Sequence, residues 1–472
     1  MRGACYRSSM AVNQIKTDYL VIGSGAVGMA FVDTLLDELP EADIVLVDRF
    51  AKPGGHWNSA YPFVTLHQPS AFYGVNSLEL SQGFKDETGL NKGLGDLATG
   101  PEILAYFESV MRQKFLPSGR VRFFPLSNYK GEGEFEHRLT GEMTKTSATK
   151  IVDCTHLNTT VPSNHTPNFE VDLGVQFIPL NDLPLISEPP QGFTIIGGGK
   201  TGIDAVLWLL ENKVSAQSIR WIKSRDAWLV NRKNTQPFPE FFQDTIGSQA
   251  NMFEAIAAAT SKSDMFDRLE ACGYFLRLDT TVRPTMFHAA TISELELQEL
   301  RRVKDVVRKG RVAAIDTQTI RFVNGLTEPT LGHVVVDCSA SAIKDNIIKP
   351  VFKDNVITPQ TVRAYQPVFS ASMIAWVEAN IEGEAAKNGL TGVVPLPDDL
   401  DAFVRMTAAN FMNQALWAQN KPLRHWMREA RLDGFSKMVS NIDPEDTAKM
   451  DILNRMRAAA MPAMGKLQSF LN

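Results

Sequence analysis

Residues 19–28 read YLVIGSGAVG, and this stretch decides the fold of the chain around it. The first four residues predict a short buried strand, and residues 29–36 continue as an apolar helix. Between them Gly23, Gly25 and Gly28 follow the spacing G-x-G-x-x-G. In such a unit the first glycine allows the turn, the second lets a pyrophosphate approach, and the third lets helix and strand pack. The stretch therefore predicts a dinucleotide-binding turn, with the N–H groups of the helix start facing the phosphates.

A second strand supports this interpretation. Residues 43–48 read DIVLVD and place an acid, Asp48, about 20 residues beyond the glycines. A carboxylate at that position accepts a hydrogen bond from a ribose hydroxyl. A glycine triplet alone would leave open an ordinary glycine-rich turn, but both strands and Asp48 together favour dinucleotide binding.

The same pattern recurs in the middle of the chain. Residues 193–210 read FTIIGGGKTGIDAVLWLL, so Gly197, Gly199 and Gly202 repeat the spacing between a strand and an apolar helix. Lys200 at the helix start would add a positive charge beside a pyrophosphate. The chain therefore contains two predicted dinucleotide-binding units.

The two units differ in charge at one position. The second strand of the later unit, residues 218–222, ends in a basic stretch with Lys223 and Arg225, where the earlier unit has Asp48. An acid there binds a ribose 2′-hydroxyl, whereas cations accommodate a 2′-phosphate. The first unit therefore suits FAD and the second suits NADPH. The alternative for the two cations is a solvated strand end.

Composition excludes several other classes. The chain has 472 residues, 44% of them hydrophobic, and a net charge of −5, which gives no reason to expect nucleic acid or an anionic membrane as partner. No run reaches the roughly 20 apolar residues of a membrane span. The four cysteines are far apart, so we expect no dithiol centre, no cysteine-based metal site and a reducing, cytoplasmic setting. Residues 1–10 lack the apolar core of a secretory signal, which leaves a tail, a weak transit sequence or a start-site artefact.

The order of these patterns predicts an α/β fold with two Rossmann-like domains and a helical C-terminal part. Residues 227–239 are expected to be a loop, and Ser293 with Glu296 predicts a capping box before a helix that reaches about Arg308. The C-terminal part is expected to be mostly helical and shows no functional signal. The predicted divisions are 17–160 for the first part of an FAD-binding domain, 161–335 for an NADPH-binding domain, and 336–472 for completion of the FAD domain and the helical region.

Two nucleotide units, the motif GGxW at residues 54–57 and the basic strand end together resemble the flavin-dependent monooxygenases. This group has flavin-containing, N-hydroxylating and Baeyer–Villiger members. The resemblance covers roughly the first half of the chain well, and the rest in order of elements only. Residues 197–228 are also similar to an adjacent set of FAD- and NADPH-binding oxidoreductases.

This resemblance implies a site and a reaction. FAD would accept a hydride from NADPH and add oxygen at its C4a carbon, and the resulting (hydro)peroxide would oxidise a small organic substrate. The residues implied for FAD are Gly23, Gly25, Ala26, Gly28, Asp48, Arg49, Gly55, His56 and Trp57, and those for NADPH are Gly197, Gly199, Lys200, Thr201, Gly202, Lys223 and Arg225.

The chain also departs from the group. The fingerprint FxGxxxHxxxW is absent, so a Baeyer–Villiger reaction is not indicated. Candidate catalytic residues are His67, as an acid–base near pH 7, and Gln68 or Asn76, as hydrogen-bond partners of the flavin or the peroxide. The alternative for each is a side chain satisfied within its loop.

Other functions and the oligomeric state stay open. An NADPH-dependent flavoprotein reductase or dehydrogenase without a dithiol centre is one alternative, and a nucleotide-binding protein without turnover is another. The expected partners are a small-molecule substrate and molecular oxygen. The sequence does not reveal the oligomeric state, and a homodimer is among the states it allows.

Overall fold

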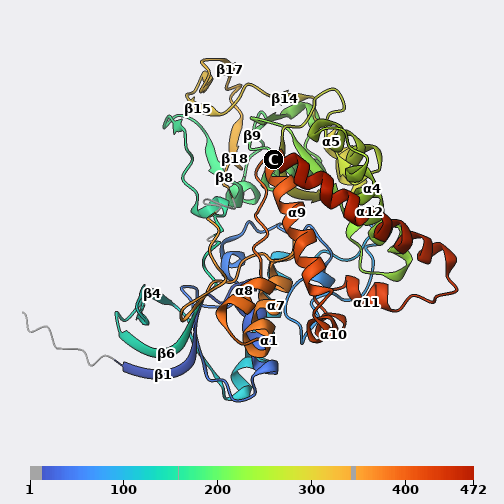
Figure 1. Ribbon diagram of the computed structural model, residues 1–472. Coiled ribbons are helices and arrows are strands. Elements are labelled where there is room, and N and C mark those ends of the chain that lie inside the picture. The colour runs from blue at the N-terminus through green and yellow to red at the C-terminus, as the bar shows by residue number, and fades with distance from the viewer. Residues whose placement is uncertain (1–12, 158, 342–346, 472) are drawn as a thin grey trace, which may run out of the picture.

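The chain folds into two lobes, each built around a parallel sheet, with C-terminal helices along one side (Figure 1). The computed structural model describes residues 13–157, 159–341 and 347–471. The basic segment 1–10, on which the sequence left several interpretations open, lies outside the described residues.

The first lobe contains an eight-stranded sheet in which β20, β6, β1, β2 and β3 are neighbours and run parallel. Helices α1, α2 and α7 pack on one face of it, and the β4–β5 hairpin packs on the other. The bounds are β1 (Asn13–Ile22), α1 (Ala26–Glu38), β2 (Ile44–Val47), α2 (Gly100–Val110), β3 (Val121–Phe124), β4 (Ser127–Gly131), β5 (Glu134–His137), β6 (Met143–Asp153), β19 (Phe352–Lys353), β20 (Val356–Ile357), α7 (Pro367–Asn380) and α8 (Glu384–Leu390).

The second lobe repeats this arrangement. Its parallel sheet has the order β14-β10-β9-β18-β8. Helices α3 and α6 pack on one face, and strands β15 and β16 pack on the other. The bounds are β7 (Glu170–Val171), β8 (Phe177–Pro179), β9 (Phe193–Ile196), α3 (Lys200–Glu211), β10 (Ile219–Ile222), α6 (Glu294–Leu300), β14 (Asp305–Val307), β15 (Val312–Ile315), β16 (Thr319–Phe322), β17 (Thr327–Pro329) and β18 (Val334–Asp337).

The closing strands of the two units end in the same way. After β6 the N–H of Cys154 donates to Ile22 at 3.0 Å, and after β18 the N–H of Cys338 donates to Ile196 at 2.9 Å. In each case the aspartate before the cysteine accepts hydrogen bonds from the hydroxyl residue after it. Both ends follow the same sequence, Val-Asp-Cys at 152–154 and 336–338, and this match fits an internal duplication.

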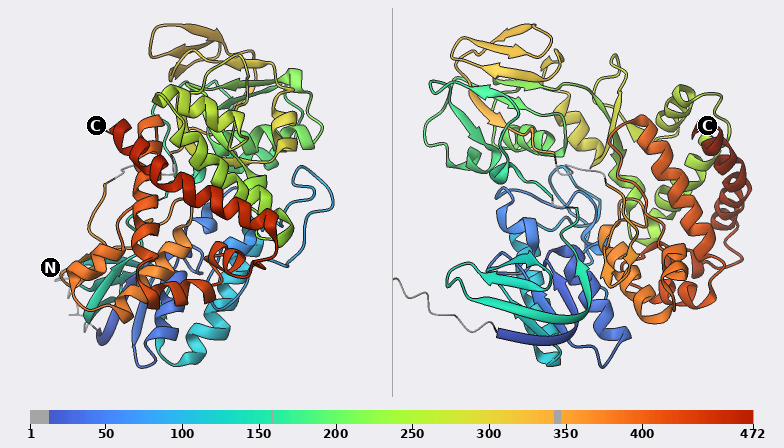
Figure 2. Two further views of the ribbon diagram at one scale, coloured as in Figure 1. Left: turned by 45° about the vertical axis from the view of Figure 1, so that its right-hand side comes forward. Right: turned by 60° about the vertical axis from the view of Figure 1, so that its left-hand side comes forward.

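A helical layer joins the lobes (Figure 2). Helix α9 has Phe403 in the core around Trp228 of β11, and ends at Trp417 in the core of the first lobe. Helix α12 packs along α4 through Ile452 and Leu453. The bounds are β11 (Ala227–Asn231), α4 (Phe242–Ala257), α5 (Lys262–Ala271), β12 (Phe275–Leu276), β13 (Met286–Ile292), α9 (Leu400–Trp417), α10 (Lys421–Glu429), α11 (Phe435–Ser440) and α12 (Thr447–Leu471). No described helix is both long enough and apolar enough to cross a membrane.

Two local expectations were wrong. The segment 227–239 was expected to be a loop, yet it begins with β11, whose Trp228 is fully buried and whose backbone pairs with β13. The capping box of Ser293 and Glu296 is confirmed, but its helix ends at Leu300 because β14 follows and pairs with β10. In both cases sheet pairing between distant segments overrides the local sequence preference.

Gly28 offers a test of the packing between α1 and β1. A methyl group there would overlap the carbonyl oxygen of Gly23, which is backbone and cannot move aside cheaply. We expect Gly28→Ala to lower the free energy of unfolding by about 1–3 kcal/mol or more in a urea titration. Gly465 is the control, since a methyl group there meets nothing within 4 Å, and its replacement in a helix by alanine should stabilise by up to ~1 kcal/mol. Equal stability of Gly28→Ala and the parent would contradict this packing.

Candidate functional site

The two glycine turns have the same backbone design. Gly23 has φ of +96° and Gly197 has φ of +139°, values that favour glycine. Helix α1 begins at Ala26 after Gly25, and α3 begins at Lys200 after Gly199, with no side chain capping either helix. The first-turn N–H groups of both helices are therefore left for a ligand.

Asp48 lies at the first turn, as the sequence predicted. The side chain is buried at the end of β2. Its Oδ2 accepts hydrogen bonds from the N–H and the hydroxyl of Ser24, at 2.5 and 2.8 Å, and its Oδ1 accepts one from the N–H of Phe50 at 2.7 Å. Because a carboxylate has about four acceptor sites, one site on Oδ1 remains for a hydroxyl group of a ligand.

The GGxW segment folds back onto the same turn. Gly54 donates to the carbonyl of Ser24 at 2.8 Å, and a Cβ on Gly55 would lie 2.8 Å from the Cα of Gly25. His56 stacks on Trp57 at 5.1 Å between ring centroids, and burial lowers its pKa to about 4. The structure therefore brings Gly23, Gly25, Ala26, Gly28, Asp48, Gly55, His56 and Trp57 to one end of the first sheet.

Arg49 is placed differently from the other predicted FAD residues. Its side chain is exposed, and its guanidinium lies over the ring of Phe50 at 5.1 Å. It follows Asp48 directly, so it lies at the rim of the first turn.

At the second turn, Lys200 is tied to the first-lobe segment that follows GGxW. Its ammonium pairs with Asp204, one helical turn along α3. The other oxygen of Asp204 accepts a hydrogen bond from the hydroxyl of Tyr61 at 2.5 Å. Thr201, the next residue of α3, is half-buried, and a Cβ on Gly199 would meet nothing within 4 Å, so the space above this turn is open.

The structure does not support the predicted role of Lys223. Its side chain is only 4% exposed, lies over Trp221 and donates to Asp226 at 2.8 Å. Burial lowers the pKa of Lys223, and the neighbouring Asp226 opposes that effect. Arg308 holds the other oxygen of Asp226 at 2.6 Å. Lys223 therefore belongs to a buried ion-pair network, whereas Arg225 is exposed at the strand end and is free to meet an anion.

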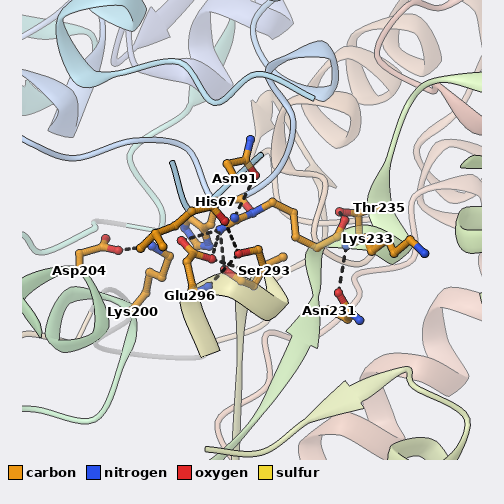
Figure 3. Close-up of polar contacts among 12 residues, drawn as sticks. His67, Asn91, Lys200, Asp204, Asn231, Lys233, Thr235, Ser293 and Glu296 are labelled. Carbon is orange, nitrogen blue, oxygen red and sulfur yellow. Dashed lines mark hydrogen bonds and ion pairs between the residues drawn. The ribbon is translucent and has the colours of Figure 1, made fainter. Parts of the chain in front are cut away.

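A buried arginine that the sequence did not single out joins the lobes. Arg232 is fully buried and donates from Nε to the carbonyl of His67 at 2.9 Å. It also donates to Asn91 at 3.1 Å and to Thr291 at 3.3 Å, and pairs with Glu296 at 2.8 Å. Figure 3 shows His67, Asn91 and Glu296 converging from different segments. The sequence had singled out two members of this cluster, His67 as a catalytic candidate and Glu296 through its capping pattern, but not Arg232, which joins them.

His67 lies between Arg232 and the second turn. Its side chain keeps a large exposed surface, although the surrounding protein removes water from part of it. Burial, and then the charges of Lys200 and Arg232, lower the pKa of His67 to about 3. An acid–base role near pH 7 requires a pKa near that value, so His67 in this environment is a neutral hydrogen-bonding group.

The other two catalytic candidates, Asn76 and Gln68, lie in different parts of the structure. Asn76 accepts a hydrogen bond from the N–H of Leu432 at 3.2 Å, beside Arg431, which donates to carbonyl groups of residues 71–75. Asn76 therefore fastens the C-terminal segment to the first lobe. Gln68 instead lines a cavity of about 460 Å³ enclosed mainly by α4, α9 and the helices after it.

Sequence comparison identifies close relatives. An uncharacterized protein of Mycobacterium tuberculosis (strain ATCC 25618 / H37Rv) is 45% identical over 459 residues, 97% of this chain and 85% of that protein. A protein of Mycobacterium bovis (strain ATCC BAA-935 / AF2122/97) gives the same values. The chain belongs to the family of these mycobacterial proteins. No family model matches the chain.

Comparison with solved structures bears on the fold class. A crystal structure of cyclohexanone monooxygenase with cyclohexanone bound, in the rotated conformation, matches with a TM-score of 0.50 at 15% identity, over 80% of this chain and 88% of that one. A flavin monooxygenase from Stenotrophomonas maltophilia matches with a TM-score of 0.46 at 14% identity, over 78% of this chain and 100% of that one. The chain therefore shares its fold with that cyclohexanone monooxygenase structure, and the predicted α/β class with two Rossmann-like units and a helical C-terminal part is confirmed.

Replacing Arg232 tests the cluster. Arg232→Met would leave the buried carboxylate of Glu296 without its cation and the carbonyl of His67 without its donor. We expect a loss of about 3–5 kcal/mol in the free energy of unfolding, measured by urea titration. Arg283→Met, which removes a pair with Asp267 at the surface, is the control and should cost at most ~1 kcal/mol. Equal losses in the two variants would contradict the clamping role of Arg232.

The pKa of His67 gives a pH test. An unfolded histidine titrates near 6.5, whereas the folded pKa is about 3. Between these values the unfolded chain binds the proton and the folded chain does not, so stability falls as the pH falls below 6.5. His67→Gln should therefore lose less stability between pH 6.5 and 4 than the parent. In NMR, the resonance missing from His67→Gln should show no titration from pH 5 to 8, and a midpoint near 6.5 would contradict the assignment.

Proposed function

We propose that this chain is an FAD- and NADPH-dependent monooxygenase that oxidises a small organic molecule. One observation carries the proposal: a single segment, residues 54–68, contacts all three parts of such a site. Gly54 bonds to Ser24 at the first glycine turn, Tyr61 bonds to Asp204 at the second, and Gln68 lines the cavity. A cofactor on each turn would therefore face the same segment, with the substrate cavity at its end.

The residues at the first turn fit FAD. The uncapped start of α1 offers N–H groups to a pyrophosphate, the close approach of Gly25 and Gly55 leaves no side chain in the way, and Asp48 keeps one acceptor site for a ribose hydroxyl. We assign residues 17–160, completed by part of 336–472, as the FAD-binding domain.

The residues at the second turn fit NADPH. Helix α3 also starts uncapped, Gly199 has open space above it, and Lys200 adds a charge at the helix start. Arg225 would contact the 2′-phosphate, and the buried Lys223 would take no part in that contact. We assign residues 161–335 as the NADPH-binding domain.

Together the two cofactors would supply a hydride and a flavin able to activate oxygen. The chain's own contribution is orientation and exclusion of water. Arg232 fixes the backbone of His67, and this places the amide of Gln68 at the cavity wall, where it can hydrogen-bond the reacting end of a substrate. His67, held neutral by its surroundings, would donate or accept a hydrogen bond there. Asn76 acts as a positioning residue through its bond to Leu432.

The fold that this chain shares with a monooxygenase supports oxygen as the electron acceptor, and isotope incorporation tests it. Purified protein reconstituted with FAD is given NADPH and ¹⁸O₂ with a panel of apolar acids, alcohols, ketones and amines. We expect one class to raise NADPH oxidation and to carry a single ¹⁸O atom in its product, detected by mass spectrometry. If the protein reduces quinones or dyes with NADPH while no product gains ¹⁸O, the reductase alternative is correct.

Cofactor preference tests the second turn. Arg225→Glu should raise the Michaelis constant for NADPH by about 10- to 150-fold, since a charged hydrogen bond contributes about 1.5–3 kcal/mol, and should leave that for NADH nearly unchanged. Lys223→Met is the matched comparison, because its partner is Asp226. It should lower stability and leave the ratio of the two constants close to the parent value. Equal effects of Arg225→Glu on NADPH and NADH would contradict the 2′-phosphate assignment.

A further inference from the structure

The cavity beside Gln68 has an apolar interior. Its volume of about 460 Å³ lies in the range of sites for small organic ligands. Residues 230–274 and the C-terminal helices supply most of its walls. Methionines and aromatic residues supply much of the apolar lining, among them Met252, Met406, Met427, Met456, Phe253 and Phe411. Such a lining favours a hydrocarbon body, and its methionines can adapt to the shape of that body.

The charged residues of this lining all have the same sign. Arg363, Arg424 and Arg428 line the cavity, and among the described residues no aspartate or glutamate does. Arg363 is buried and pairs with Asp433 at 2.9 Å, and its Nε has no hydrogen-bond partner. Because the charge of Arg363 is already paired with Asp433, the positive charges left for a ligand at this cavity are those of Arg424 and Arg428.

Arg424 and Arg428 have no ion-pair partner in the part of the chain that the structure describes. They are four residues apart on α10 and therefore lie on one face of the helix. Both side chains are exposed, and within the described ranges neither guanidinium has an ion pair or a hydrogen bond. Two unpaired guanidinium groups at the edge of an apolar cavity form a binding place for a carboxylate, which arginine can hold through two hydrogen bonds.

We propose that this cavity binds an apolar molecule carrying one carboxylate. Its hydrocarbon body lies among the methionine and aromatic side chains, and its carboxylate lies against Arg424 and Arg428. The apolar body would then extend toward Gln68. Binding of this molecule does not depend on the proposed function. Its role as the substrate does.

Calorimetry with two matched probes tests the proposal. Decanoate and decan-1-ol have the same chain length and differ in the charge of the head group. We expect the parent protein, loaded with FAD, to bind decanoate more tightly than decan-1-ol. The double variant R424Q/R428Q should raise the dissociation constant of decanoate about tenfold and that of decan-1-ol less than twofold. The control is Arg457→Gln, an exposed arginine on α12 outside the cavity lining, which should change neither.

Three results would overturn the proposal: no binding of decanoate, equal affinity of the parent for both probes, or an unchanged decanoate affinity in R424Q/R428Q. Reduction of the bound flavin by NADPH is measured on the same samples. If NADPH reduces the bound flavin but the binding tests fail, only this inference is wrong. If the binding tests succeed but NADPH does not reduce the bound flavin, only the proposed function is wrong.

Discussion

The buried guanidinium of Arg232 holds the centre of this molecule together. It reaches the backbone of His67 and the side chain of Asn91 on one side, and Thr291 and Glu296 on the other. A buried cation is stable only when its hydrogen bonds and its charge are satisfied. Because its partners come from both lobes, satisfying this one residue fixes the segment around His67 against the second sheet (Figure 3).

This constraint gives the site its shape. The segment 54–68 leaves the first glycine turn, bonds to α3 through Tyr61 and ends beside the cavity at Gln68. The helical layer lines that cavity, and Arg431 and Asn76 hold the segment after α10 onto the first lobe. Each of the two nucleotide units is thus an ordinary strand–turn–helix. The chemistry that we propose depends on the segment 54–68 and the helical layer, which connect the two units.

The strand–turn–helix units could be predicted from the sequence, whereas the contacts between the segments that connect them could not. The glycine turns and Asp48 were readable because each depends on residues close together in the chain. Lys223 was misjudged because its burial depends on Asp226 and Arg308, and a basic strand end reads the same whether its cations are buried or exposed. Arg232, Arg424 and Arg428 carried no local signal, since their surroundings come from segments hundreds of residues apart. For the same reason the C-terminal helices looked functionally silent, although they line most of the cavity.

The central claim is that two glycine turns hold FAD and NADPH against one shared segment. Anaerobic addition of NADPH to the FAD-loaded protein, followed by visible absorbance in a stopped-flow instrument, tests it most directly. The account predicts rapid bleaching of the flavin by NADPH and much slower bleaching by NADH at the same concentration. Flavin that stays oxidised after excess NADPH would contradict it and would leave a nucleotide-binding protein without turnover.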